Sequence, residues 1–269
     1  MPPSARSIGT LADTVSAPTP TRPTSLRLIL VATFLASMSG GALSSAIYFV
    51  TETSYGYTAK GNLFLALVMG GAYALVARGT GTILRTVERH LSARTALQAA
   101  LMAWGLTSLL PFLFPRSEAA LWTAAIGGAA TSAITWPIVQ TFLSAGRSGR
   151  VLRSSIGWFN VTWTPATALP QLLMPLLAVY HPRPTFALAA LSPFVAAAVV
   201  WRFPNSPPPD TGDDGAHEIG AAYVALARSS GWLLPLGYLL SFTLTPILPH
   251  RLGAVGVPDD WKGAVGAVW

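Results

Sequence analysis

The sequence contains no cysteine, and this absence excludes several kinds of chemistry. Disulfides, thiolate catalysis and cysteine-ligated metals all need that side chain. A Gly-x-Ser-x-Gly nucleophile elbow is also missing. The four histidines lie in loops or near the ends of apolar runs, and no two are four residues apart: His90, His181, His217 and His250. We therefore expect no enzyme, no metal site and no bound cofactor.

Charged residues are scarce. They make up 10% of the chain, whereas roughly 25% is usual for a soluble domain. Hydrophobic residues make up 52%, and 24 glycines and 22 prolines are spread through the apolar stretches. Helix interiors tolerate such residues in membranes, where neighbouring helices satisfy the freed backbone groups. These features predict an all-α polytopic bundle of transmembrane helices, with the lipid bilayer as the main surroundings.

Seven apolar runs approach the length of about 20 residues that a membrane-spanning helix needs. They lie near 26–50, 61–77, 95–114, 118–143, 154–180, 184–202 and 231–250. An eighth run begins at Gly263 and stops at Trp269 after about seven residues, which is far too short to cross a bilayer. We therefore expect seven spans and a chain that is truncated at its C-terminus.

The positive charges predict how these spans are oriented. If the N-terminus is cytoplasmic, the inner segments hold 12 of the 17 Lys and Arg residues, and such an excess is typical of cytoplasmic loops. We therefore expect a multi-pass protein of the inner membrane with its N-terminus in the cytoplasm. This distribution accounts for the net charge of +7, so nucleic acid is not an expected partner.

Composition divides the chain into four segments. Residues 1–25 are rich in Pro, Ser and Thr and are expected to form a disordered cytoplasmic tail. A cleaved signal peptide is the alternative, but the run that follows is longer than a signal core. Residues 26–203 are predicted to form a six-helix bundle. Residues 204–230, which contain three consecutive prolines and several acidic residues, are predicted to form a cytoplasmic linker. Residues 231–269 begin a second membrane bundle.

Six spans, a long inner loop and a restarted set of spans resemble the major facilitator superfamily. The loop between the second and third spans is similar to that family's Gly-x-x-x-Asp-Arg-x-Gly-Arg-Arg/Lys motif. Glu88 and Arg89 match the Asp-Arg pair, Leu91 replaces the second glycine, and the next basic residue is Arg94. The resemblance implies a conformational latch formed by Glu88, Arg89 and Arg94, whereas an ordinary basic inner loop is the alternative.

Two polar stripes within the spans are candidates for contact with a solute. The fourth span carries one at four-residue steps, and the fifth span carries the other at helical spacing. The predicted substrate-binding residues are Ser132, Trp136 and Gln140 on the fourth span, and Asn160, Trp163 and Gln171 on the fifth. Interhelical hydrogen bonding is the simpler interpretation of such amides. The resemblance favours the fourth span, because the family's first and fourth helices line its central cavity.

No carboxylate lies in the middle of a predicted span. We therefore expect a secondary transporter of a small neutral or largely apolar organic solute, working by alternating access. If transport is coupled to protons, the group that carries the proton is expected to be Glu52 near the outer end or to lie in helices beyond the chain. The alternative is a uniporter, which needs no such group. A seven-helix receptor or a non-transporting membrane scaffold is the alternative. Lys60 and Lys262, the only lysines, lie in predicted loops, so a retinal Schiff base in the seventh span is excluded.

Overall fold

The computed structural model describes residues 23–87, 91–173, 182–208, 229, 240 and 243–268, and every regular element among them is helical. The first predicted span is a continuous helix, Leu26–Tyr55. It consists of α1 (Leu26–Gly41), a wider π-helical turn η1 (Ala42–Ala46) and α2 (Ile47–Tyr55). It ends at Gly56, whose φ of +67° is a left-handed conformation that suits glycine after a helix.

Five further helices in the described residues belong to the main body of the molecule. Ser92 and Ser117 cap two of them, since each hydroxyl accepts a hydrogen bond from the backbone N–H three residues later. The five helices are α3 (Ala59–Val87), α4 (Ala93–Leu113), α5 (Glu118–Ser144), α6 (Gly149–Leu172) and α8 (Arg183–Val200).

Four helices in the described residues are long and apolar enough to cross a membrane: Leu26–Tyr55, Ala59–Thr86, Ala93–Leu113 and Arg183–Val200. The all-α membrane-helix class is thus supported, but the predicted count of seven spans is not confirmed. The predicted spans 118–143 and 154–180 correspond to α5 and α6, of 27 and 24 residues. Neither is among the four, and residues 174–180 lie outside the described part.

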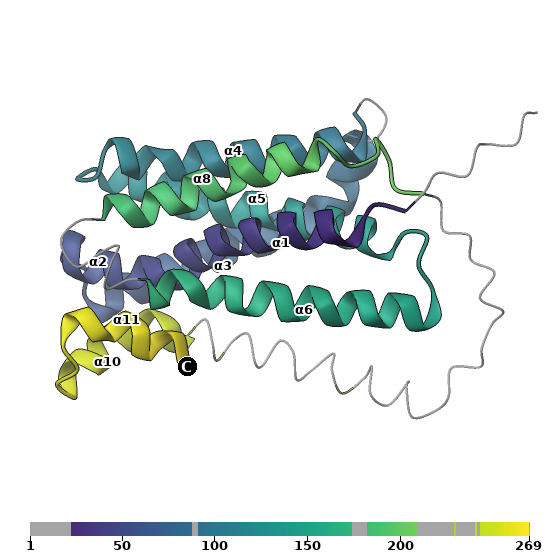
Figure 1. Ribbon diagram of the computed structural model, residues 1–269. Helices are drawn as coiled ribbons and strands as arrows, with labels where there is room; N and C mark the ends of the chain where they lie inside the picture. Colours follow the sequence, from purple (N-terminus) through teal and green to yellow (C-terminus); the bar gives the residue numbers. More distant parts are fainter. Residues whose placement is uncertain are drawn as a thin grey trace, which may run out of the picture.

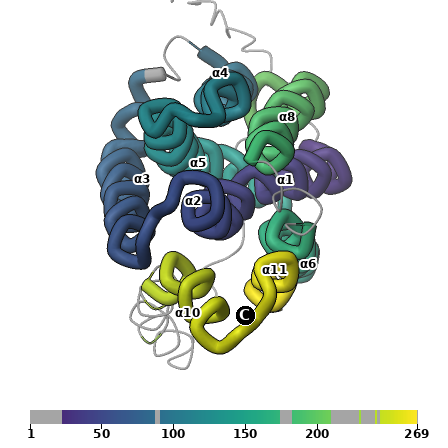
Figure 2. The backbone as a smooth tube through the Cα atoms, turned by 90° about the vertical axis from the view of Figure 1, so that its left-hand side faces the viewer, coloured from purple at the N-terminus to yellow at the C-terminus, as the bar shows by residue number. Residues whose placement is uncertain are grey.

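The helices form one bundle and run alternately up and down it (Figure 1). Viewed down the bundle, α4 and α8 lie on one side, α1 and α5 in the middle, and α3 and α6 toward the opposite corners (Figure 2). The most extensive packing joins α4 with α8, α4 with α5, α1 with α6, α1 with α8, and α3 with α5.

These five packed pairs have an internal order. Exchanging the first three long helices (α1 with α2, α3, α4) for the next three (α5, α6, α8) turns α1·α6 into α5·α3, and α1·α8 into α5·α4. The α4·α8 pair is converted into itself. Because α1 and α5 run in opposite directions (Figure 1), this is the exchange that a two-fold axis across the bundle would produce.

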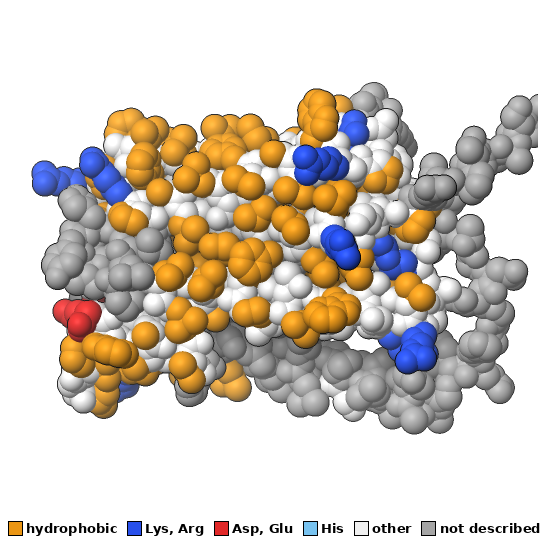
Figure 3. Space-filling model, in the orientation of Figure 1, with side chains coloured by type: hydrophobic (Ala, Val, Ile, Leu, Met, Phe, Trp, Pro, Cys, Tyr) orange, Lys and Arg blue, Asp and Glu red, His pale blue; other side chains and the backbone are white. Residues whose placement is uncertain are grey.

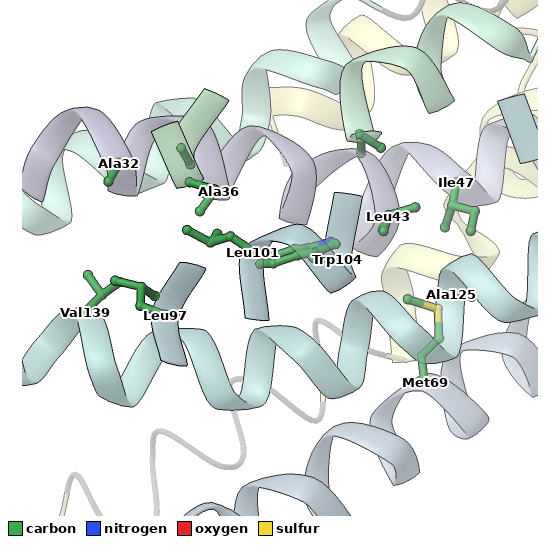
Figure 4. Packing of buried hydrophobic residues seen from close by; sticks show 14 of the residues in the cluster. Ala32, Ala36, Leu43, Ile47, Met69, Leu97, Leu101, Trp104, Ala125 and Val139 are labelled. Atoms are coloured by element: carbon green, nitrogen blue, oxygen red, sulfur yellow. The ribbon is translucent and has the colours of Figure 1, made fainter. Parts of the chain in front are cut away.

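Small residues allow the helices to approach closely at the centre. A Cβ at Gly128 of α5 would lie 2.6 Å from Leu43 and 3.3 Å from the indole nitrogen of Trp104. Trp104 of α4 is buried and points toward the first span (Figure 4). A Cβ at Gly41 would overlap the backbone carbonyl of Thr167 in α6. The small residues of the first span therefore form a packing surface. Tyr48, near the outer end of the same span, is also buried in the core.

The two ends of the bundle differ in charge. Arginines gather toward the end where α1 begins, and acidic side chains are seen only at the other end (Figure 3). Among the described residues, no Asp or Glu lies near the first end, which we call the inner end. Its arginines are Arg27, Arg78, Arg85, Arg94, Arg147, Arg150, Arg153 and Arg202. The asymmetry agrees with the positive-inside pattern, while the sidedness itself stays a prediction.

The C-terminal residues pack at the other end, which we call the outer end. A 3-10 turn, η2 (Thr245–Ile247), is followed by α10 (Leu248–Ala254) and α11 (Asp259–Val268). Here η2 contacts α3, α10 contacts α2, and α11 packs on α6 (Figure 2). Of the predicted span 231–250, only residues 240 and 243–250 are described. The tail 1–22 and linker residues 209–228 also lie outside the described part.

Candidate functional site

The predicted stripe on α5 is partly accessible. Ser132 and Trp136 are half-buried, and Gln140 is exposed near the inner end. The Ser132 hydroxyl donates to the carbonyl of Ala129 in its own helix, at 2.9 Å. Trp136 reaches the neighbouring helix, where its ring meets that of Phe159 edge to face, with 6.3 Å between centroids. Trp136 is therefore the member of this stripe with a ring contact to α6.

The stripe on α6 divides into an exposed and a buried part. Asn160 is exposed, and its side-chain oxygen accepts a 3.0 Å hydrogen bond from the indole N–H of Trp163. Gln171, near the end of the helix, is only 7% exposed. The predicted shared face is therefore correct for Asn160 and Trp163, which form a polar and aromatic pair within one helical turn.

One ring contact joins α5 to α6 beside the two stripes. The Trp136 ring meets Phe159, the residue before Asn160, whereas no hydrogen bond or ring contact joins Trp136 to Asn160 or Trp163 among the described residues. No hydrogen bond links Ser132 or Gln140 to α6 among the described residues. The solute-binding role of these six side chains stays a prediction.

Of the proposed latch, Arg94 lies within the described residues, whereas Glu88 and Arg89 lie outside them. Arg94 lies in the first turn of α4. Its guanidinium donates to the carbonyls of Trp201 and Phe203, at 3.5 and 3.2 Å. It also lies over the Trp201 ring, 5.8 Å from the centroid. A cation at a helix C-terminus compensates the unpaired carbonyls and the helix dipole. Arg94 thus ties the start of α4 to the end of α8.

Arg147 likewise caps the C-terminus of a helix at the inner end of the bundle. Its guanidinium donates to the carbonyls of Phe142 and Leu143 in the last turn of α5, at 3.1 and 2.8 Å. It also donates to the carbonyl of Thr24 just before α1. The two arginines explain, by helix capping, part of the positive charge at the inner end.

A cluster of charged residues joins the first span to the C-terminal helices at the outer end. Glu52 of α2 lies 3.5 Å from Nδ1 of His250 and 3.4 Å from Nζ of Lys262, both measured from Oε1. Lys262 also pairs with Asp259 at 2.7 Å. The Lys262 side chain is only 8% exposed. These four residues, Glu52, His250, Asp259 and Lys262, are called the outer charge cluster below.

The outer charge cluster is incompletely satisfied. Oε2 of Glu52 and Nε2 of His250 are buried without a hydrogen-bond partner in the described part of the chain. Burial by itself lowers the pKa of Lys262, but its hydrogen bond to Asp259 and the nearby Glu52 carboxylate outweigh this effect and raise the pKa. The Lys262 ammonium is therefore kept charged by its two acidic neighbours, and their attraction attaches α11 to α2.

A buried amide beside this cluster was not singled out from the sequence. Asn62 of α3 is fully buried; its side-chain oxygen lies 2.6 Å from the Thr51 hydroxyl, and its NH₂ donates to the carbonyl of Tyr48 at 3.1 Å. The pair fixes α2 against α3. Asn62 stands at the very start of an apolar run, and no local pattern distinguishes it from a residue of the preceding loop.

A depression of about 370 Å³ lies at the outer end, where α2 is followed by α3 and where α5 begins. Its lining includes Tyr57, Phe64, Glu118 and Trp122. No group of three or more metal-ligating side chains occurs among the described residues. Neither a comparison with protein-family models nor a search of curated proteins finds a match for the chain.

Proposed function

We propose that the chain carries the first half, and the beginning of the second half, of a secondary transporter of the major facilitator type. It would move a small neutral or largely apolar organic solute by alternating access. The observation that carries the proposal is the exchange pattern of the packed pairs, in which each of α1, α3 and α4 takes the place of α5, α6 or α8. Each six-helix half of this family is built from two inverted three-helix repeats, which produce such a pattern.

The polar residues of α5 and α6 support a solute path between them. Trp136, Asn160 and Trp163 combine ring surfaces with an amide and form no ion pair in the described residues. A fixed charge in this region would favour an ionic solute, whereas rings and amides suit a neutral one. The proposed path is therefore lined by Trp136 on one side and by the Asn160–Trp163 pair on the other.

The outer charge cluster supports a role in closing the outer end. Glu52 belongs to the first span, whereas His250 and Lys262 follow the predicted linker and belong to the proposed second half. Opening the outer end would separate these residues and break both contacts. Protonation of Glu52 would weaken the attraction to Lys262, which is how a proton could be coupled to opening.

The first experiment tests the topology on which the proposal depends. Single cysteines at Ser25, Thr58, Ser148, His181 and Gly212 have no competing thiols in this cysteine-free chain. A membrane-impermeant reagent added to intact cells is expected to label the cysteines at Thr58 and His181 only. Labelling at Ser148 or Gly212 would contradict the six-span half with its inner linker.

The second experiment tests transport. The purified protein is screened by thermal shift against neutral organic solutes, and each stabilising solute is then measured for counterflow in proteoliposomes. Trp136→Leu is expected to abolish both the shift and the counterflow. Trp158→Leu, at an exposed tryptophan of α6, is the matched control and should retain both. A stabilising solute that is never carried across the bilayer would favour the receptor alternative.

A further inference from the structure

The outer depression gathers aromatic side chains from three segments of the chain. Tyr57 follows α2, Phe64 lies in the second turn of α3, and Trp122 lies in the second turn of α5. The depression opens to the outside, and its volume of about 370 Å³ is at the lower end of the range for small-ligand sites. It is separate from the proposed solute path on α5 and α6.

The rings are held in fixed positions by one another. The indole N–H of Trp122 donates to the Tyr57 hydroxyl at 3.0 Å, and the Phe64 ring meets Trp122 at 61° with 5.7 Å between centroids. Burial raises the pKa of Tyr57, the Trp122 hydrogen bond lowers it, and the Glu118 carboxylate raises it again. The negative charge of Glu118 therefore acts directly on this group of rings.

Glu118 has no ion-pair partner in the described part of the chain. Lys60 and Arg116 are cations of the same region. Both are exposed, and neither forms an ion pair with Glu118 in the described structure. Glu118 stands in the first turn of α5, where the helix dipole stabilises a carboxylate. That location accounts for an acidic residue at this position but not for the three rings around the same depression.

We propose that this depression is a binding site for a quaternary ammonium cation, held by Tyr57, Phe64 and Trp122 and neutralised by Glu118. Such a cation has no N–H to donate, so it is recognised by the negative faces of aromatic rings and by a nearby carboxylate. Two sources carry this chemistry: a free organic cation outside the cell, or the choline headgroup of a lipid. The site does not depend on transport.

Binding is tested on the whole protein in nanodiscs of phosphatidylglycerol and phosphatidylethanolamine, which contain no choline, by calorimetry with benzyltrimethylammonium. Glu118→Gln and Phe64→Leu are each expected to raise Kd by about tenfold or more. Asp260→Asn and Phe114→Leu, exposed residues at the same end of the bundle, are the matched controls and should leave Kd unchanged. The melting temperature without ligand reports any loss of the helix-dipole contribution of Glu118.

A second set of nanodiscs distinguishes the two sources: phosphatidylcholine replaces phosphatidylethanolamine at the same phosphatidylglycerol content, so the surface charge is unchanged. If the lipid headgroup occupies the site, benzyltrimethylammonium binds more weakly in these discs, and Glu118→Gln removes that difference. If free cations are the ligands, affinity is the same in both lipids. The proposal is overturned if wild type binds no cation in either lipid, or if Glu118→Gln binds as wild type does, since the rings then only anchor the membrane interface.

Discussion

Replacing Gly41 with alanine tests the packing on which the whole bundle depends. Gly41 is the last residue of α1, and it lies against the backbone of Thr167 in α6. An added Cβ would overlap the Thr167 carbonyl oxygen and lie 2.8 and 2.9 Å from the carbonyl carbon and Cα. Because all three atoms belong to the backbone, no change of rotamer relieves the overlap. The two helices must move apart.

The expected loss of stability follows from two opposing effects. Overpacking of a well-packed contact costs about 1–3 kcal/mol. Alanine is a better helix former than glycine, which returns about 1 kcal/mol. The net effect of Gly41→Ala is therefore a loss of up to about 2 kcal/mol. Gly70→Ala on α3 is the matched control, since its Cβ meets nothing within 4 Å in the described structure. Only the helix-propensity effect remains at this position, so Gly70→Ala should leave the free energy of unfolding unchanged or raise it.

Both variants are purified in the same detergent, and unfolding is followed by circular dichroism during heating and during titration with sodium dodecyl sulfate. We expect Gly41→Ala to unfold several degrees below wild type and Gly70→Ala at or above it. Equal behaviour of the two variants would refute the close approach of α1 and α6. It would also remove one of the packed pairs on which the proposed function rests.

Three further predictions concern single polar residues. Asn62→Ala removes the buried amide between α2 and α3 and should lower the free energy of unfolding by about 1–3 kcal/mol in the detergent titration. Arg94→Gln should speed amide hydrogen exchange in the last turn of α8, whereas Arg85→Gln, an exposed arginine on α3, should not change it. The pKa of Lys262 is raised above its ordinary value of 10.5, so the stability from its ion pairs is complete below that value and is lost as pH rises through the folded pKa. The wild-type melting temperature should therefore fall more steeply above about pH 10 than that of Lys262→Met, and parallel curves would contradict this.

The helices were predictable where apolar runs and helices coincide. The runs 95–114 and 184–202 match α4 (Ala93–Leu113) and α8 (Arg183–Val200) within two residues. The run 61–77 does not, because α3 continues to Val87. Residues 78–87 contain arginines but no proline, and a charge ends an apolar run without ending a helix. Hydropathy therefore locates the membrane-embedded part of a helix and not its full length.

The candidate site was predictable only in its local part. Asn160 and Trp163 are one turn apart, so helical spacing alone places them on one face, and their side chains do form a hydrogen bond. The pairing of Glu52 with Lys262 joins residues 210 positions apart. Nothing in the neighbourhood of either residue encodes that contact, because it depends on how α11 packs on the finished bundle.

The first span connects the features on which the proposed mechanism depends. It carries the Gly41 contact with α6 near its middle and Glu52 of the outer charge cluster near its outer end, with the π-helical turn η1 between them. A π-helical turn has one residue more than the α-helical ladder requires, and such turns are frequent at functional sites. If the outer end opens by breaking the contacts of Glu52, η1 is the point in this helix where α2 can move while α1 remains packed against α6. Deleting one residue within η1 would remove the extra residue of the π-helical turn and leave a regular α-helix. The deletion should therefore abolish transport even where the helix stays folded.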